Sequence, residues 1–343
     1  MSKLASLSAS SSRRSPVWWP AIGLMLLVVA NTIFEPSFLA LKMVDGHLYG
    51  TPIDIFNQGS RIMLLALGMT LVIATGGVDL SVGSTVAISG AVCAQLLSGG
   101  TPLPIVLAAA IGVGMTIGLA NGLLIARLGL QPIVATLILM VAGRGVAQLI
   151  TDGQVLPIKS EAFEYLANGY IAALPFAALL VGALYLAAHF ALRKTAAGLF
   201  IEAVGDNATA SRFAGLAAAR IKAGVYIFSG TCAGLCGALA ASHIRAADSY
   251  RAGENMELDA IFAVVIGGTA LTGGRFFLVG SMVGALLLQT LTLSMYYLGV
   301  PPSVAPVPKA LLIVAVALLQ SERVRRNLNR LWQRRAKSQE AAP

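Results

Sequence analysis

Residues 68–84 read GMTLVIATGGVDLSVGS, and this stretch indicates how the whole chain is built. An apolar run ends at two adjacent glycines, a carboxylate follows, and a second apolar run begins after Ser81. Because backbone groups in lipid must be hydrogen-bonded within the protein, each long apolar run is predicted to be a helix. The stretch therefore predicts two membrane helices joined by a glycine-rich turn that carries Asp79.

The composition of the 343-residue chain extends this prediction to the whole protein. Hydrophobic residues make up 57% of it and charged residues 11%, and the mean hydropathy is +0.80. A soluble domain carries about 25% charged residues, so a soluble, disordered or collagen-like protein is excluded. The three cysteines all lie in apolar runs, so neither a disulfide framework nor a metal site is expected.

We predict an all-α polytopic membrane protein with about ten transmembrane helices, some of them short and interrupted by glycine. The first apolar run is expected to remain in the membrane and not to be a cleaved signal. Residues 1–16 are predicted to be a cytoplasmic tail, 17–320 the transmembrane domain with a cytoplasmic loop at 193–222, and 321–343 a basic cytoplasmic tail. The predicted spans are 17–39, 61–75, 80–98, 103–126, 132–150, 171–192, 221–243, 257–272, 277–298 and 303–320.

The charged residues predict the orientation of these spans. With the N-terminus in the cytoplasm, the inner segments hold 17 of the 24 Lys and Arg residues, whereas the outer segments hold most of the acidic residues. Arg61 is counted among the outer basic residues. The positive-inside rule then places both termini in the cytoplasm. The net charge of +9 is thereby explained by membrane orientation, and no nucleic-acid partner is expected.

Two glycine-rich strings share one pattern, G-G-x-x-L-[S/T]-x-G. They are GGVDLSVG at 76–83 and GGTALTGG at 267–274, after the second and eighth spans, which are both predicted to be short. Short, glycine-interrupted spans in both halves of a transporter indicate broken helices near the transport path and an internal duplication. The predicted helix-break residues are Gly76, Gly77, Gly83, Gly267, Gly268 and Gly274.

Other glycines are spaced four residues apart, at 114, 118 and 122 and again at 280 and 284. Small residues with this spacing let helix backbones approach closely in lipid. These glycines are therefore predicted to pack helices against one another.

Polar residues within or beside the apolar spans are candidates for the transport pathway. Asp79 is predicted to be the one carboxylate inside the apolar region, and such a residue is either functional or the cap of the following helix. Arg144 needs a carboxylate or carbonyl partner, and Asp79 is one possibility. The candidate pathway residues are Asp79, Ser81, Asn121, Arg144 and Gln148.

The loop at 193–222 is predicted to hold a short helix on the cytoplasmic side. Asp206 or Asn207 can cap this helix, which would continue to about Ala214 and end at Gly215. The helix is too small to form a core of its own. It is therefore either a docking element for another protein or an ordinary structured loop.

The sequence lacks the motifs of an ATP-hydrolysing or other soluble enzyme. It contains no Gly-Lys pair, so it has no phosphate-binding loop. The chain is expected to be a transport subunit without cofactors of its own and not an enzyme.

These motifs resemble the ribose-type family of bacterial ABC importer permeases. The resemblance covers about residues 50–320 and is carried by GMTLVIATGGVDLSVGS at 68–84 and ELDAIFAVVIGGTALTGGRF at 257–276. Within that family, QPIVATLILMVAGRGVAQLIT at 131–151 and GLFIEAVGDNATASRFAG at 198–215 are similar to galactofuranose importer permeases. The two terminal tails lie outside the resemblance.

The resemblance implies a complete importer in the bacterial inner membrane. Its other parts would be a cytoplasmic ATPase that binds ATP and Mg, a periplasmic sugar-binding protein, and a second and different permease. This chain would form the path for a monosaccharide, most closely galactofuranose, by alternating access. The family's coupling helix would fall on about 207–215, which makes the ATPase-coupling residues Asp206, Asn207, Ala210, Arg212, Phe213 and Gly215.

Three other functions stay open at this point. The first is a secondary sugar transporter that couples uptake to an ion gradient through Asp79. The second is a membrane-bound enzyme, and the third is a passive channel. The sequence does not identify the sugar, because a separate binding protein would select it.

Overall fold

A computed structural model of the chain describes residues 17–44, 46–301, 304, 306–311 and 314. The long helices are α1 (Trp18–Phe34), α2 (Thr51–Ala74), α3 (Val82–Ser98), α4 (Leu103–Ala126), α5 (Pro132–Ile150), α7 (Phe176–Lys194), α10 (Ala218–Ile244) and α12 (Leu278–Tyr297). The shorter helices are α6 (Glu161–Asn168), α8 (Ala196–Asp206), α9 (Ala208–Phe213) and α11 (Met256–Ile266), and Pro36–Leu39 forms a 3-10 turn. Residues 306–311 are also helical.

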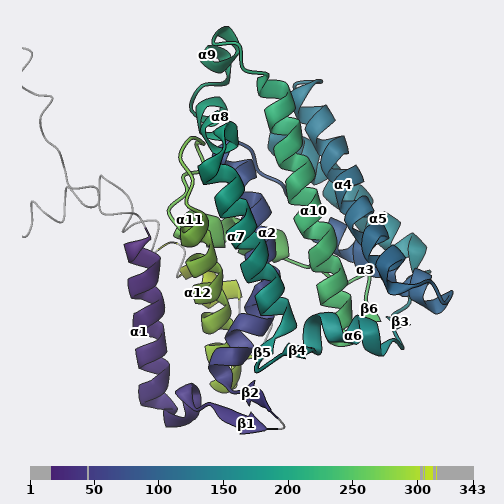
Figure 1. Ribbon diagram of the computed structural model, residues 1–343, viewed down its shortest axis with the longest axis vertical. Helices are drawn as coiled ribbons and strands as arrows, with labels where there is room; N and C mark the ends of the chain where they lie inside the picture. The colour runs from purple at the N-terminus through teal and green to yellow at the C-terminus, as the bar shows by residue number, and fades with distance from the viewer. Residues whose placement is uncertain (1–16, 45, 302–303, 305, 312–313, 315–343) are drawn as a thin grey trace, which may run out of the picture.

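Three short antiparallel strand pairs complete the described structure. β1 (Lys42–Val44) pairs with β2 (His47–Tyr49), β3 (Leu156–Pro157) with β6 (Ala246–Ala247), and β4 (Tyr170–Ile171) with β5 (Leu174–Pro175). The long helices lie alongside one another, with α8 and α9 at one end of the bundle and the strands and α6 at the opposite end (Figure 1). We call these the α9 end and the strand end.

Within the described residues, six helices are long and apolar enough to cross a membrane, namely α2, α4, α5, α7, α10 and α12. Helices α1 and α3 are apolar but shorter, at 17 residues each. Each of the first nine predicted spans overlaps a described helix, whereas most of the tenth, 303–320, and both tails, 1–16 and 321–343, lie outside the described residues. The chain is a polytopic helical membrane protein, and the number of ten spans stays a prediction.

The second span is not short, as the sequence had suggested. Helix α2 has 24 residues and begins at Thr51, ten residues before the predicted start, with a proline in its first turn. Proline suits this position because it fixes φ at a helical value and its missing N–H would be unpaired there anyway. Hydropathy missed the first half of α2 because Asp54, Gln58 and Arg61 interrupt it. Arg61 therefore lies inside a membrane helix and not in an outer segment.

The eighth span is short, as predicted, but it ends earlier. Helix α11 has 11 residues and stops at Ile266, where Gly267 caps it. Before it, residues 248–255 form turns and not helix. At 1.5 Å per residue, α11 covers only about half of the hydrocarbon thickness.

The core of the bundle lies around α2, α3, α10 and α12, which are buried along most of their length. By contrast, α1, α4 and α5 expose many large apolar side chains, including Met25, Leu119 and Val141. Such faces suit lipid or another membrane subunit.

Helix α10 packs against α4 through facing glycines, as their spacing predicted. A Cβ atom at Gly114 would overlap the carbonyl oxygen of Gly230, and one at Gly118 would lie 2.8 Å from the Cα of Ile227. A Cβ atom at Gly280 would likewise overlap the backbone of Gly267, so α12 and α11 also meet through small residues. The absence of side chains at these positions is what lets the backbones touch.

We predict that Gly114→Ala destabilises the protein, because the added methyl group would force α4 and α10 apart. Overpacking of this kind costs about 1–3 kcal/mol. Gly112→Ala is the matched control on the same helix, since a Cβ there would meet nothing within 4 Å. Thermal unfolding of the two purified variants in detergent measures the difference, and equal melting temperatures would contradict the packing described.

Candidate functional site

Asp79 lies in a buried hydrogen-bond network between α2 and α3. Its carboxylate accepts hydrogen bonds from the backbone N–H of Ser81 at 3.1 Å and from the Ser81 hydroxyl at 2.7 Å. The Ser229 hydroxyl of α10 donates to its other oxygen at 2.9 Å. Asn121 of α4 donates to Ser81 at 2.7 Å and to Asp79 at 3.4 Å. Asp79, Ser81 and Asn121 are each at most 1% exposed.

This geometry shows what the carboxylate does locally. Asp79 bonds the N–H of Ser81, the residue that precedes α3, so it shapes the start of that helix in the manner of a cap. At the same time it joins α3 to α10, and Ser81 joins α3 to α4. In this conformation the network is closed to solvent, so none of its members lines an open path.

Arg144 of α5 is separate from this network, and Asp79 is not its partner. Its guanidinium donates to the backbone carbonyl of Ala252. Its neighbouring carboxylate is Glu257, in the first turn of α11, close enough for the two charges to interact. Gln148, one turn further along α5, is half-buried, and its side chain forms no hydrogen bond with the described residues. The structure therefore divides the predicted pathway residues into two groups.

Glu257 is an interior carboxylate that sequence reasoning missed. Its Oε2 atom is buried and has no hydrogen-bond partner among the described residues. A Cβ atom at Gly83 would overlap this oxygen, so the glycine makes room for the carboxylate. The prediction that Asp79 is the one interior carboxylate was wrong, because the start of α11 lies deeper in the bundle than its place in the sequence indicated.

Arg61 is the second charged residue missed, and the sequence did carry a signal for it. Asp54, Gln58 and Arg61 are spaced four and three residues apart, which places them on one face of a helix. Gln58 accepts a hydrogen bond from Gln289 of α12 at 3.3 Å. A search for polar residues at helical spacing would have located the beginning of α2, which a search by mean hydropathy missed.

The glycine strings form tight turns at helix ends. Gly76 and Gly268 both have positive φ, +75° and +95°, and each donates its N–H to the carbonyl three residues earlier. In the structure, Gly76 therefore corresponds to Gly268. The alignment of the two strings had instead matched Gly76 with Gly267, one residue earlier. Gly77 and Gly267 flank these turns, Gly83 follows the start of α3, and Gly274 lies before α12, so the breaks fall between helices and not within one span.

At the α9 end, Asn207 and not Asp206 caps the short helix. Asp206 is the last residue of α8, and the Asn207 side chain accepts hydrogen bonds from the N–H groups of Thr209 and Ala210 at 3.0 and 2.9 Å. Gly215 follows α9 with a φ of +87°. The predicted helix and its end are thus confirmed, with the cap assigned to one of the two candidates.

Helix α9 lies at the tip of the bundle (Figure 1). Phe213 is 88% exposed, and Ala210 and Arg212 are exposed too. Ser211 instead faces inward and donates to the carbonyl of Ala203 at 2.9 Å. An exposed aromatic ring on a capped helix is a surface suited to a protein partner.

The segment that carries α9 is in direct backbone contact with both glycine strings. The N–H of Gly274 donates to the carbonyl of Ala74, the last residue of α2, at 2.8 Å. Gly205, in the last turn of α8, lies so close that a Cβ atom would overlap this same carbonyl. A Cβ atom at Gly273 would lie 2.9 Å from the Gly205 carbonyl oxygen and 2.9 Å from the Gly76 nitrogen. Three distant segments therefore meet behind α9 without intervening side chains, and we call this contact the glycine joint (Gly76, Gly205, Gly273 and Gly274).

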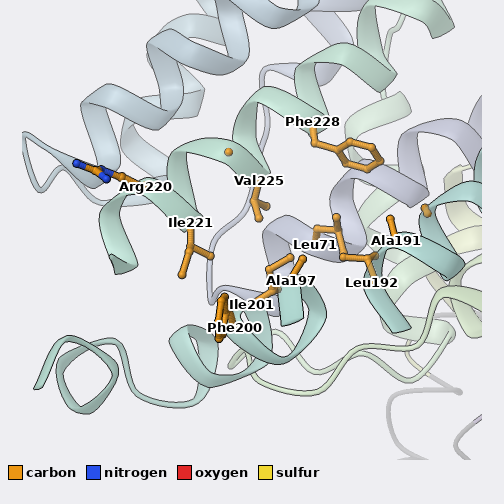
Figure 2. A pocket seen from close by; sticks show the side chains of 12 residues that line it. Leu71, Ala191, Leu192, Ala197, Phe200, Ile201, Arg220, Ile221, Val225 and Phe228 are labelled. Carbon is orange, nitrogen blue, oxygen red and sulfur yellow. The ribbon is translucent and has the colours of Figure 1, made fainter. Parts of the chain in front are cut away.

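A pocket of about 370 Å³ lies near the α9 end, between α2, α7, α8 and α10. Figure 2 shows that Leu71, Leu192, Phe200, Ile201 and Val225 gather around it, whereas Arg220 points away from them. Its lining is almost wholly apolar and lacks the groups that would bind a polar solute.

The family of the chain follows from its match to known proteins. Residues 51–317 match the family model described as branched-chain amino acid transport system / permease component. The chain belongs to this permease family. The match begins at the first residue of α2, so it covers the transmembrane bundle apart from α1.

Three curated proteins similar to this permease are named as sugar transport proteins. It is 46% identical to the galactofuranose transporter permease protein YtfT of Escherichia coli strain K12, over 89% of this chain and 91% of that protein. It is 38% identical to the fructose import permease protein FruF of Bifidobacterium longum, over 90% and 89%. It is 34% identical to the ribose import permease protein RbsC of Escherichia coli strain K12, over 88% and 92%. No solved structure was found to match the chain.

We predict that Asp79→Ala lowers the stability of the permease, because the donors on Ser81 and Ser229 would lose their acceptor inside the protein. A buried group left unpaired costs about 1–3 kcal/mol. Asp79→Asn should lose less, since its amide oxygen still accepts from Ser81. Thermal unfolding in detergent measures both, with Ser98→Ala as the control at an exposed serine.

A different result would support an ion-coupling role. If Asp79→Asn left the melting temperature unchanged but abolished uptake, the carboxylate would be functional and not structural.

Proposed function

We propose that this chain is a permease subunit of an ATP-driven importer of monosaccharides, with galactofuranose or a sugar similar to it as cargo. What carries the proposal is the combination of a sugar-permease sequence over nearly the whole chain with a capped, exposed helix α9 at one end of the bundle. In this proposal α9 is the coupling helix and lies in the cytoplasm, together with both termini of the chain. The surrounding membrane is the bacterial inner membrane.

The partners follow from what this permease lacks and what it exposes. A cytoplasmic ATPase, which binds ATP and Mg, would receive α9 through Ala210, Arg212 and Phe213. A second permease of different sequence would cover part of the apolar faces of α4 and α5, with lipid on the rest. A periplasmic sugar-binding protein would deliver the sugar to the strand end.

The glycine joint supports a mechanical role for α9. Since Gly205 contacts the end of α2 and the 270–276 segment directly, a displacement of α8 and α9 would be passed to both. Because no side chain lies between these backbones, a displacement of one cannot be accommodated by side-chain rearrangement and must move the other. Closure of the ATPase would in this way bias the bundle between inward-open and outward-open states, to the extent that the ATPase binds the two states differently.

We predict that Ala210→Arg abolishes ATP-dependent uptake while membrane insertion stays normal. Ala210 is exposed on α9, so a large cation there would not disturb the bundle but would obstruct the ATPase. Ala162→Arg on α6 is the matched control, because it places the same side chain on an exposed alanine at the strand end. Uptake of labelled galactose, ribose and fructose, each tested alone, is measured in cells that contain the whole importer.

Cross-linking tests the contact itself. Thr209→Cys is the suitable position because Thr209 is exposed, whereas the Ser211 hydroxyl faces inward. We expect Thr209→Cys to form a disulfide with a cysteine introduced in the ATPase groove. Normal uptake by Ala210→Arg, or modification of Thr209→Cys from the outer side of the membrane, would contradict the proposal.

A further inference from the structure

A pocket of about 340 Å³ lies between α2, α3, α10 and the segment before α11. Four charged residues line it: Arg61 of α2, and Asp248, Arg251 and Glu254 of the 248–255 segment. We call it the outer pocket. Its volume is at the lower end of the roughly 300–1,000 Å³ typical of small-molecule sites.

The outer pocket reaches the middle of the membrane domain. Arg61 is ten residues from the start of α2, which places it about 15 Å along that helix. Gly90 of α3 and Gly237 of α10, which also line the pocket, lie well inside their helices. Charged side chains at such depth face a bundle interior or a water-filled cavity and not lipid. The open side of the pocket therefore faces water or another subunit.

The 248–255 segment is held at this depth by backbone contacts. A Cβ atom at Gly253 would overlap the carbonyl oxygen of Gly83, at the start of α3. Next to it, the carbonyl of Ala252 accepts the hydrogen bond from Arg144. Non-helical backbone within a membrane domain is tolerated only where it is buried in protein or lines a cavity. This segment does both, which is typical of a transport path.

The charges of the outer pocket are balanced but not paired with one another. Two arginines and two carboxylates give no net charge, and neither Arg61, Arg251 nor Glu254 forms an ion pair or side-chain hydrogen bond with any described residue. Asp248 uses one oxygen to accept the N–H groups of Tyr250 and Arg251 and keeps the other. The pocket thus offers several donors and acceptors for neutral hydroxyl groups.

We propose that the outer pocket is the site where the permease holds a neutral monosaccharide during import. This inference rests on the proposed function and names the contact residues within it. Arg61 and Arg251 donate to sugar hydroxyl oxygens, and Asp248 and Glu254 accept from sugar hydroxyl groups. Because the pocket has no net charge, it favours a neutral sugar over a sugar phosphate or a sugar acid.

Uptake by variants of the whole importer tests the residues. Arg61→Gln and Glu254→Gln should each lower the initial rate of galactose, ribose or fructose uptake about tenfold or more, because each removes a charged hydrogen-bond partner. Arg61→Lys should recover part of the rate, since it keeps the charge but not the two-pronged geometry. Lys159→Gln, at an exposed cation of the strand end outside the pocket, is the control and should stay within about twofold of the wild type.

Labelling gives a measurement that does not depend on transport. Ala240→Cys places a thiol in the pocket wall, and the native cysteines are at most 5% exposed. A charged methanethiosulfonate added from outside should modify it, and the imported sugar with its binding protein should slow that reaction. Lys159→Cys should be modified with no protection by sugar.

The outcomes separate this inference from the proposed function. If uptake of these sugars persists in cells that lack the ATPase, the proposed function fails. If the wild-type importer imports sugar, but Arg61→Gln and Glu254→Gln do so at the wild-type rate and Ala240→Cys is not protected, the outer pocket is not the sugar site. Protection of Ala240→Cys by a sugar phosphate or a sugar acid would overturn the preference for neutral ligands.

Discussion

The need to pair every backbone N–H and C=O group away from water shapes this protein more than any other constraint. In lipid the pairing is possible within helices or closed β-barrels, and this chain uses long helices. Where the chain is not helical inside the bundle, its backbone groups bond to other segments of the same chain. The Gly274 N–H finds the free carbonyl of Ala74 at the end of α2, and the Ala252 carbonyl finds Arg144. Each irregular segment is therefore also a junction between helices.

Glycine is what makes these junctions possible. The close approaches of α4 to α10 and of α11 to α12 need bare backbone on both sides. The same holds at the glycine joint, where α8 meets the end of α2. One residue type thus gives tight static packing in the middle of the bundle and direct backbone contact beneath α9. The second use connects the surface proposed for an ATPase with the helices proposed to form the path.

The charged residues of the membrane domain lie in a closed network and in an open pocket. Asp79 is satisfied by Ser81 and Ser229 and is shut off from solvent, so it fastens helices together. Arg61 and Glu254 lack such partners among the described residues and line a cavity. The sequence alone does not show whether a charged residue such as Asp79 or Glu254 finds hydrogen-bond donors in the fold. The difference lies in which hydroxyl groups the neighbouring helices bring to it.

The sequence by itself determined that the chain is a helical membrane protein, where its apolar helices lie, that a short capped helix follows α8, and which family the chain resembles. These features depend on local properties, namely hydropathy, glycine spacing, and an Asn and a Gly at the two ends of α9. Only the tertiary structure decided that Arg144 donates to the Ala252 carbonyl and not to Asp79, that α2 begins at Thr51, and that Gly253 of the 248–255 segment packs against the start of α3. Those facts depend on contacts between residues that are far apart in the chain. The physical reason is that a charge or a free carbonyl interacts with the groups nearest to it in space, and these groups need not be near it in the sequence.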